Sequence, residues 1–355
     1  MNKGQKKNVL FLPKYPRLGA SSRLRTYQYL PLWEEKGVSF TVKPLFNEQY
    51  LRELYNNGNI SKRNVLWCYF ERWKVLWTVK KYNWVVIEKE LFPYLPYFFE
   101  KIAYKIGPHY ILDYDDAIFH HYNRKGSWWR GILKNKIDKV MAKGNQVWAG
   151  NPYLATTAEE SGAAEVTVLP TVIDLHRYPV LPKKDSKTIK IGWVGSPTTL
   201  KYLERLKPVF EVLMKQFDIR LCIIAHGEGI GLKSIEENLV WSENIEVELI
   251  RDLDIGLMPL EDTPWEQGKC AYKLIQYMAC CLPVIASPIG MNKEVVIHGH
   301  NGYWANDHQD WEHYLKKLIE NPALRAQMGQ EGRKIVEEKY TLQHNWKKVK
   351  SLIGF

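Results

Sequence analysis

Short apolar runs alternate with longer amphipathic stretches along the first half of the chain. The runs that have the length of buried strands are Val9–Leu12, Val38–Val42, Trp84–Ile87, Tyr110–Leu112 and Gln146–Ala149. The stretches between them have helical spacing, beginning with Leu24–Gly37. Alternation of strands and helices at this spacing predicts a parallel, doubly wound sheet.

The same alternation stops and then restarts in the second half. Thr167–Pro170 ends the first half, and Tyr178–Lys187 is rich in Pro and Lys, as linkers are. The strands predicted after the linker are Ile189–Val194, Arg220–Ala225, Ile255–Met258 and Pro283–Ala286. The predicted helices are Leu200–Phe217, Ala271–Cys280, Trp311–Ile319 and Pro322–Glu338. The chain therefore reads as two copies of one α/β architecture.

This pattern predicts a division of the chain into domains. We expect a Rossmann-like domain over residues 1–175, a linker over 176–187 and a second Rossmann-like domain over 188–335. A last helix over 336–355 is expected to pack back on the first domain. The length of 355 residues suits two domains of roughly 150–180 residues each.

The net positive charge of the chain comes entirely from its first half. Residues 1–172 contain 26 Lys and Arg against 15 Asp and Glu, a balance of +11, whereas residues 173–355 contain 24 of each. Such asymmetry predicts that the first half meets something anionic: a membrane surface, a lipid phosphate or a nucleic acid. Zinc-finger and helix-turn-helix spacings are missing, which argues against nucleic acid.

The cysteines and the apolar runs indicate in which cellular compartment the protein is expected. The five cysteines lack metal-ligand spacing and include the adjacent pair Cys280-Cys281, so we expect reduced thiols and no zinc. The run Val9–Pro13 is too short for a signal-peptide core, and none approaches the about 18 apolar residues of a spanning helix. We expect a cytoplasmic protein, soluble or peripheral on the inner face of the membrane.

The most informative stretch runs from Asp252 to Gly302. A predicted strand ends in a polar loop that contains Glu266, then come Gly268 and Lys269, and a helix begins near Ala271. A helix N-terminus carries free N–H groups and partial positive charge, which suits a phosphate. Lysines at this end, Lys269 and Lys273, make sense beneath an anionic ligand. The alternative is surface lysines paired with nearby glutamates, Glu261 or Glu266.

The sequences KLIQYMACCLPVIASPIG and HGHNGYW carry a resemblance to a known family. They resemble the donor-binding region of family 4 retaining glycosyltransferases of the GT-B fold. The resemblance is specific from Ile191 to Gly302 and covers most of the chain in architecture. It implies two Rossmann-like domains that face each other across a cleft, with the donor mainly on the C-terminal domain.

The resemblance also implies which residues bind the donor. Gln276 stands where the family has a ribose-binding Glu, the family's other Glu falls on Gly268, and Cys281 replaces a glycine. Lys269, Lys273 and the loop residue Glu266 belong to the same site. In IGWVGSPTT, a strand is followed by a turn that meets the diphosphate. The turn residues assigned to the donor are Gly195, Ser196 and Thr198.

Loops after the predicted N-terminal strands supply the acceptor side. Ser22, Arg23 and Arg25 open the first helix, where arginines can grip an acceptor or a lipid phosphate, or simply be solvated. Glu90 follows the third strand, and it is assigned to the acceptor side as well.

Asp116 and His120 follow the fourth strand and are the candidates for taking the acceptor proton. An Asp-x-Asp-Asp group can also chelate a divalent metal, but the resembling fold uses helix ends and basic side chains instead, so no metal is expected.

Arg124–Lys143 is amphipathic, with apolar residues at helical spacing and lysines opposite. It is either a helix that faces the core or an interfacial segment that inserts Trp128 and Trp129 among lipid headgroups. The second reading, with the charge asymmetry, points to a polyprenyl-linked acceptor at the membrane face.

The sequence thus predicts a glycosyltransferase that moves a sugar from a nucleotide-sugar to a glycan or a polyprenyl-diphosphate-linked acceptor, with retention, in bacterial surface-polysaccharide synthesis. UDP is favoured over GDP as the nucleotide, which is a co-substrate, and no cofactor is expected. A nucleotide-sugar epimerase or hydrolase of the same fold and a catalytically silent scaffold stay open as alternatives.

Overall fold

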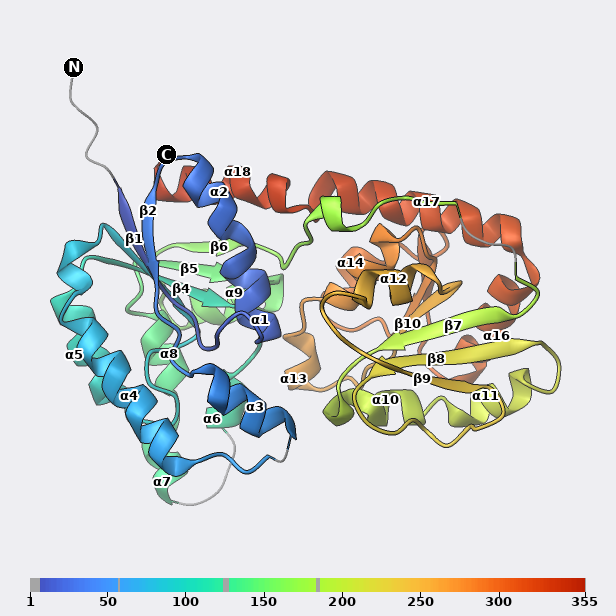
Figure 1. Ribbon diagram of the computed structural model, residues 1–355, viewed down its shortest axis with the longest axis horizontal. Coiled ribbons are helices and arrows are strands. Elements are labelled where there is room, and N and C mark those ends of the chain that lie inside the picture. The colour runs from blue at the N-terminus through green and yellow to red at the C-terminus, as the bar shows by residue number, and fades with distance from the viewer. Residues whose placement is uncertain (1–6, 57, 124–127, 183–185, 355) are drawn as a thin grey trace. The chain divides into compact units, whose positions relative to one another are not determined.

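The computed structural model describes residues 7–56, 58–123, 128–182 and 186–354. The chain divides into two compact units (Figure 1). Unit 1 consists of Met1–Thr171, Gly268–Cys270 and Lys348–Phe355, and unit 2 of Val172–Gln267 and Ala271–Lys347. The division follows Thr171, somewhat before the stretch that the sequence marks as a linker.

Unit 1 is built on a six-stranded parallel sheet with the order β2-β1-β3-β4-β5-β6. Its strands are β1 Asn8–Leu12, β2 Ser39–Val42, β3 Trp84–Glu88, β4 His109–Tyr114, β5 Gln146–Ala149 and β6 Val166–Val168. The five predicted strands are confirmed. The sixth, β6, is only three residues long and half-buried, so its hydrophobic pattern is too weak to predict.

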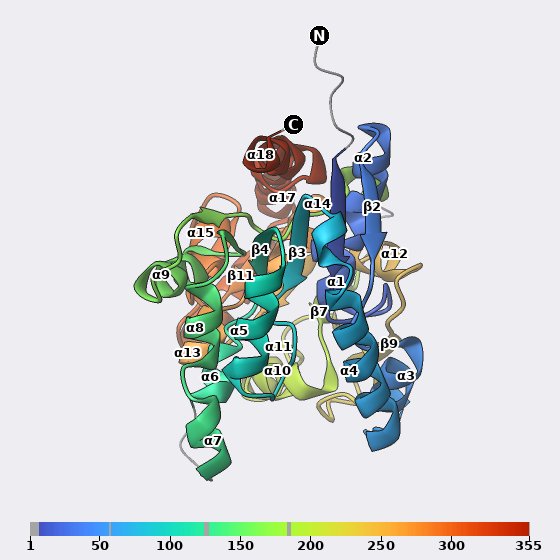
Figure 2. The same ribbon diagram turned by 90° about the vertical axis from the view of Figure 1, so that its left-hand side faces the viewer.

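Helices flank this sheet on both faces (Figure 2). They are α1 Ala20–Arg25, α2 Leu30–Glu35, α3 Glu48–Asn56, α4 Lys62–Leu76, α5 Tyr97–Ile106, α6 Phe119–Tyr122, α7 Trp128–Leu133, α8 Lys136–Met141 and α9 Pro152–Glu160. The helix expected over Leu24–Gly37 is interrupted by a 3₁₀ turn at Tyr27–Tyr29. Pro31, which lacks an N–H, lies in the first turn of α2 where that donor is not needed.

Unit 2 repeats the design with a second six-stranded parallel sheet of order β12-β11-β10-β7-β8-β9. Its strands are β7 Ile189–Val194, β8 Ile219–Ala225, β9 Glu236–Val240, β10 Ile255–Met258, β11 Val284–Ala286 and β12 Gly302–Trp304. The four predicted strands are confirmed. The edge strand β9 has the largely polar sequence EENLV, which hides it from a hydrophobic pattern.

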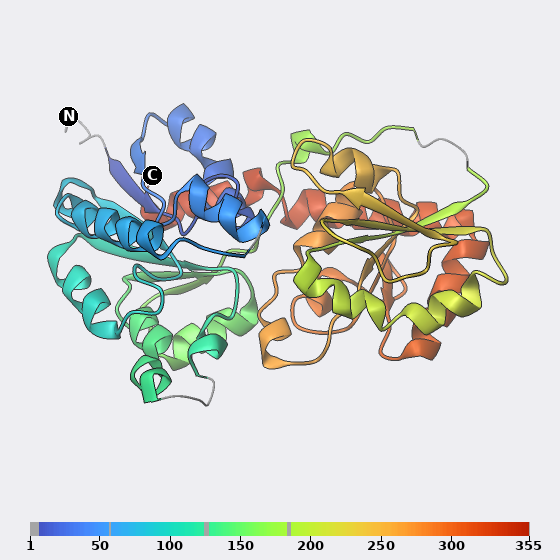
Figure 3. The same ribbon diagram turned by 60° about the horizontal axis from the view of Figure 1, so that its bottom comes forward.

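The helices of unit 2 include α10 Leu200–Glu204, α11 Lys207–Leu213, α12 Glu246–Arg251, α13 Pro264–Gln267, α14 Tyr272–Ala279, α15 Asn292–Val295, α16 His308–Glu320 and α17 Pro322–Lys339. α12 and α14 lie on one side of the sheet, and α10 and α11 on the other (Figures 1 and 3). The helix predicted over Leu200–Phe217 is split, because Pro208 opens α11 as a new helix. A buried core that includes Trp193, Phe210 and Trp311 joins the sheet to α11 and α16.

The last helix, α18 Leu342–Ile353, begins in unit 2 and ends in unit 1. Its end is bound to the sheet of unit 1, because the Gln146 side-chain amide of β5 donates a hydrogen bond of 3.0 Å to the Leu352 carbonyl oxygen. The Lys7 ammonium donates a second, of 3.2 Å, to the Ile353 carbonyl oxygen. The C-terminal eight residues therefore belong structurally to the N-terminal unit.

Candidate functional site

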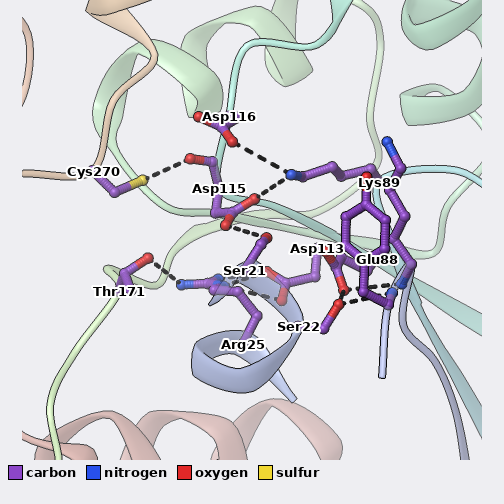
Figure 4. A network of polar contacts seen from close by, with 12 residues as sticks. Ser21, Ser22, Arg25, Glu88, Lys89, Asp113, Asp115, Asp116, Thr171 and Cys270 are labelled. Atoms are coloured by element: carbon purple, nitrogen blue, oxygen red, sulfur yellow. Dashed lines mark hydrogen bonds and ion pairs between the residues drawn. The ribbon is translucent and has the colours of Figure 1, made fainter. Parts of the chain in front are cut away.

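A network of buried charged side chains lies where the central strands of unit 1 end (Figure 4). Because parallel strands point the same way, their carboxyl ends meet at one edge of the sheet, where ligands of such sheets bind. The residues that α1, β3 and β4 bring to this edge are Ser21, Ser22, Arg25, Glu88, Lys89, Asp113, Asp115 and Asp116. The segment Gly268–Cys270 completes the network.

Arg25 and Asp113 form a buried ion pair in this network. The Arg25 Nε lies 3.1 Å from each Asp113 carboxylate oxygen, and a terminal nitrogen donates 2.7 Å to the Leu169 carbonyl. Burial raises the pKa of Asp113 even though the guanidinium opposes this. The expected acceptor-gripping role of Arg25 stays a prediction, but its guanidinium is already committed to partners inside unit 1.

Lys89 lies between two carboxylates with only 7% of its side chain exposed. Its ammonium is 2.9 Å from Asp115 and 3.4 Å from Asp116. Burial alone would lower the pKa of Lys89, yet the carboxylates raise it well above its ordinary value. Burial likewise raises the pKa of Asp115, but Lys89 and the Ser21 hydroxyl outweigh it and lower that pKa to about 2. Both groups are therefore charged at neutral pH.

Glu88 ties the loop after β1 to the network. One of its carboxylate oxygens accepts hydrogen bonds from the Lys14 N–H, at 3.0 Å, and from the Ser22 hydroxyl, at 2.5 Å. The Ser22 hydroxyl in turn accepts one from the Tyr15 N–H, at 3.0 Å. Burial raises the pKa of Glu88. Ser22, which the sequence assigned to the acceptor, is completely buried and shapes this loop.

The two candidate catalytic residues lie at the same edge. Asp116 stands between two ammonium groups, 3.4 Å from Lys89 and 3.2 Å from Lys269, and 28% of its side chain is exposed. The His120 Nε2 lies 2.8 Å from the Tyr153 hydroxyl. Asp116 thus combines a fixed geometry with access to solvent, which a proton-accepting group needs. Their catalytic roles stay predictions.

Glu90 lies in a separate buried cluster. It accepts 2.6 Å hydrogen bonds from the Tyr122 hydroxyl and from the ammonium of Lys136, which is itself 3.4 Å from Glu100. All these side chains are buried, so the structure gives Glu90 a place inside unit 1 rather than an open surface. Arg23, also assigned to the acceptor side, is only 4% exposed.

The segment Gly268–Cys270 is bound to the ends of β4 and β5. The Asn151 side-chain amide donates 3.0 Å to the Lys269 carbonyl, and the Cys270 thiol donates 3.1 Å to the Asp115 carbonyl. A Cβ atom on Gly268 would lie 2.4 Å from that of Ala117. No side chain fits there without a shift, which explains why a glutamate is not found at this position.

In unit 2, the turn after β7 and the start of α14 lie together. The Val194 N–H donates 2.8 Å to the Tyr277 hydroxyl of α14, which holds the helix against the end of β7. The Lys273 ammonium lies over the Trp193 ring, 4.9 Å from its centre. Ser196 and Thr198 follow at once in the turn, both exposed, and their hydroxyls are 2.9 Å apart. Of the predicted donor residues, Gly195, Ser196 and Thr198 thus share one turn, and Lys273 contacts the strand that leads into it.

The other two predicted donor residues of unit 2 are buried. The Glu266 carboxylate is 3% exposed and accepts hydrogen bonds from the hydroxyls of Tyr202 and Thr263. Gln276 is 2% exposed, and its side-chain amide donates 3.0 Å to the Tyr178 hydroxyl. The Gln276 side chain therefore braces the interior of unit 2, and a ribose contact from it stays a prediction.

Two residues with a left-handed backbone bracket α14. Ala271 before the helix has φ 51°, and Cys281 after it has φ 58°. This region favours glycine, because a Cβ atom is crowded there. Cys281 occupies the position where the resembling family has glycine, so the backbone shape is kept although the residue differs.

Within the described residues, no group of three or more His, Cys, Asp or Glu side chains could hold a metal ion. None of the helices in the same ranges is long and apolar enough to cross a membrane. The prediction for the amphipathic stretch 124–143 is tested only in part, because residues 124–127 and the side chains of 128–130 lie outside the described residues. In α8, Ile137, Val140 and Met141 are fully buried, so this half of the stretch faces the core.

Sequence reasoning missed the central residue of the unit 1 network, Lys89. It stands in the sequence IEKELFP directly before Glu90, which the sequence assigned to the acceptor side. The sequence did contain a signal for Lys89. Three charged residues directly follow an apolar run, and at the buried end of a central strand such charges need partners of opposite sign.

The unit 2 part of this site lies in a segment that is similar to a known family. Residues 180–335 match the family model of glycosyl transferases group 1. The matched segment is less than half of the chain, and it is similar to that family. The match agrees with the predicted glycosyltransferase class, whereas the narrower retaining group is not tested.

Curated relatives agree with the family. An uncharacterised glycosyltransferase of Methanocaldococcus jannaschii is 25% identical over 182 residues, which are 47% of this chain and 44% of the relative. The capsular polysaccharide biosynthesis glycosyltransferase CapM of Staphylococcus aureus is 25% identical over 170 residues, 46% of this chain and 45% of the relative. The chain thus covers less than half the length of these relatives.

Solved structures match nearly the whole chain. HepE of Anabaena, in complex with UDP and glucose, has a TM-score of 0.68 at 15% identity, over 98% of this chain and all of the other. Sucrose-phosphate synthase of Thermosynechococcus elongatus has a TM-score of 0.72 at 13% identity, over 98% of both chains. The predicted α/β fold of two Rossmann-like units, of the GT-B type, is confirmed.

Proposed function

We propose that this chain is a glycosyltransferase that takes a sugar from a nucleotide-sugar held mainly by unit 2. The observation that carries the proposal is the packing of α14 against the end of β7, through the Val194–Tyr277 hydrogen bond and the Lys273–Trp193 contact, inside the segment that matches the family. There the exposed Ser196 and Thr198 follow β7, and Lys273 in the first turn of α14 lies over the ring of Trp193, a residue of that strand. Hydroxyls, backbone N–H groups and one cation are the donors that a diphosphate requires.

We further propose UDP as the nucleotide. HepE, which shares the fold, has been solved with UDP and with UDP-glucose. The nucleotide-sugar serves as co-substrate, and the proposal needs neither cofactor nor metal. The similarity to CapM supports an acceptor in surface-polysaccharide synthesis, either a glycan or a polyprenyl-diphosphate-linked sugar at the cytoplasmic face of a bacterial membrane.

In the proposed reaction the bond between the anomeric carbon and the diphosphate breaks, and a bond to an acceptor oxygen forms. Under retention, the leaving diphosphate takes the acceptor proton on the same face of the sugar, and the protein orients the partners and stabilises the phosphate charge. Lys273 is assigned to that charge. Asp116 and His120 at the unit 1 edge are assigned to hydrogen bonds that orient the acceptor hydroxyl, and in a reaction without retention one of them would take its proton instead.

The test is thermal stabilisation of the protein by a panel of UDP-, GDP-, dTDP- and CMP-sugars. A ligand at about 100 times its dissociation constant stabilises the native state by about 2.7 kcal/mol, which is easily seen in a melting curve. We expect UDP-sugars to stabilise the wild type, and Lys273→Ala to lower their affinity roughly 10- to 100-fold. Lys316→Ala, which removes a lysine of α16 that is paired with Glu312, is the matched control.

Three results would count against the proposal. Stabilisation by UDP-sugars that Lys273→Ala leaves unchanged would move the phosphate site away from α14. Stabilisation by no nucleotide-sugar, together with no sugar transfer to lipid-linked acceptors, would favour a silent scaffold. Release of free sugar without any acceptor would point to a hydrolase.

A further inference from the structure

One face of α4 exposes large apolar side chains to solvent. Leu66 is 72% exposed, Trp67 56%, Phe70 53% and Trp77, directly after the helix, 75%. With 3.6 residues per turn, these positions fall within a sector of about 100° around the helix axis. Residues on the opposite side, such as Cys68 and Leu76, are buried against unit 1. We call the four exposed side chains the α4 face.

Lysines and an arginine surround the α4 face. The exposed basic residues of Lys62–Lys81 are Lys62, Arg63, Lys74, Lys80 and Lys81. They outnumber the acidic residues of this stretch by five to one, the one being Glu71. The Lys74 ammonium lies over two rings of the face, 5.5 Å from the centre of Trp67 and 5.1 Å from that of Phe70. Apolar and cationic groups thus share one surface.

The start of α4 adds an independent observation. Lys62 and Arg63 occupy its first turn, which contains no acidic residue. The partial positive charge of a helix N-terminus disfavours cations there, so they cost stability unless an anion lies nearby. A surface hollow of about 560 Å³ at this end is lined by Arg63, Leu66 and Phe70, among others. Its lining combines a guanidinium with apolar side chains, as a lipid headgroup and its acyl chain would require.

We propose that the α4 face docks unit 1 onto a bilayer that contains anionic lipids. Tryptophans and long apolar side chains beside lysines are the composition of surfaces that insert among headgroups. A second copy of this chain fits poorly, because a symmetric interface would bring the same face, with its excess of cations, against itself. Charge complementarity therefore selects an anionic partner, and the exposed apolar area selects a lipid one.

This inference rests on the proposed function in one respect: docking would bring the enzyme to a lipid-linked acceptor. Docking itself needs neither donor nor acceptor. It also differs from the membrane segment that the sequence suggested, 124–143, half of which faces the core. The α4 stretch was not singled out there, because apolar residues occur on all sides of this helix and its pattern looks like that of a buried one.

The experiment is co-sedimentation of the full chain with vesicles, without any nucleotide-sugar. One set consists of equal parts of phosphatidylglycerol and phosphatidylcholine, and the other of phosphatidylcholine alone. The wild type is expected to bind the anionic vesicles, more weakly as salt is added, and to bind the neutral ones little. Hydrogen exchange at residues 62–81 is expected to slow when anionic vesicles are present.

Two variants separate the apolar and the electrostatic contributions. Leu66→Ser/Phe70→Ser should weaken binding to anionic vesicles by about tenfold or more, because it removes the inserted apolar area. Lys80→Ser/Lys81→Ser should weaken it roughly fivefold for each charge removed. The matched control is Val240→Ser/Ile297→Ser, which removes apolar side chains of unit 2 that are 68% and 48% exposed. This control should bind as the wild type does.

Failure of docking and failure of the proposed function give different results. Lys273→Ala should lose nucleotide binding and keep vesicle binding. The docking proposal is wrong if the wild type does not bind anionic vesicles, or if Leu66→Ser/Phe70→Ser binds them unchanged. It is also wrong if that variant abolishes self-association in a sedimentation-velocity experiment while neither protein binds vesicles, since the face would then join two copies of the chain.

Discussion

The two strand-end regions are built from different chemistry. In unit 1, four carboxylates lie among the cations Arg25, Lys89 and Lys269, and most of these side chains are buried. In unit 2, the corresponding turn presents the exposed Ser196 and Thr198. The charged side chains of unit 1 mainly pair with one another, whereas the hydroxyls of the unit 2 turn lie at the exposed surface.

The difference teaches which groups can meet a ligand. A buried ion pair costs desolvation energy, which its partners offset only while both are present. The unit 1 network therefore reads as a preorganised frame that positions the more accessible Asp116. In the unit 2 turn, the hydroxyls of Ser196, Thr198 and Thr199 bond to one another at the surface, where an incoming phosphate can replace these bonds. Substitutions in the two regions should accordingly have opposite signatures, one in stability and the other in binding.

The largest effect is expected at the Arg25–Asp113 pair. Arg25→Met leaves a buried, uncompensated carboxylate and should lower the free energy of unfolding by about 3–5 kcal/mol. Lys273→Met in unit 2, which removes a contact with an aromatic ring, should cost about 1 kcal/mol or less. Urea unfolding followed by circular dichroism measures both.

A double variant sharpens this test. Arg25→Met/Asp113→Leu replaces the ion pair with apolar groups and should recover most of the lost stability. Equal stabilities for Arg25→Met and Lys273→Met would break the comparison, since the unit 1 network would then contribute no more than a surface contact does.

The second effect is a pH dependence that originates in Asp115. Its pKa is lowered from 3.8 to about 2 in the folded protein, so its contribution is complete above the unfolded value and is lost as the pH falls through the folded value. Asp115→Asn should therefore reduce the acid-induced loss of stability between about pH 4 and pH 2 by roughly 2 kcal/mol. Urea unfolding at a series of pH values gives this profile.

Glu88 provides the control of opposite sign. Burial raises its pKa, so its protonation on acidification favours the fold. Glu88→Gln should remove that gain and make the acid-induced loss steeper. A profile that both substitutions shift in the same direction would contradict the assignment of the two carboxyl groups.

The smallest effect is expected in unit 2, at the backbone of Cys281. Its φ of 58° favours glycine, so Cys281→Gly should raise the free energy of unfolding by about 1 kcal/mol or less. Cys280, with φ −88°, is the neighbour for comparison, and Cys280→Gly should lower stability by about 1 kcal/mol. Thermal melts of both variants measure these changes in stability. The prediction is contradicted if Cys280→Gly raises the melting temperature while Cys281→Gly leaves it unchanged.

The sequence by itself determined the architecture of two parallel sheets flanked by helices. Alternation of apolar runs with amphipathic stretches is a local signal, and it predicted nine of the strands at nearly their observed positions. It failed at β6, β9 and β12, which are very short or lie at a polar sheet edge. The motif around α14 is also local, and it pointed to the family whose model matches residues 180–335.

Only the tertiary structure decided which residues meet. Arg25 and Asp113 are 88 positions apart in the chain, and Asp116 and Lys269 are 153 apart. Such pairs depend on the order and register of parallel strands, which no local pattern encodes. The structure likewise assigned Gly268–Cys270 to unit 1 and left the α4 face uncovered, because burial depends on what the rest of the chain packs against each surface.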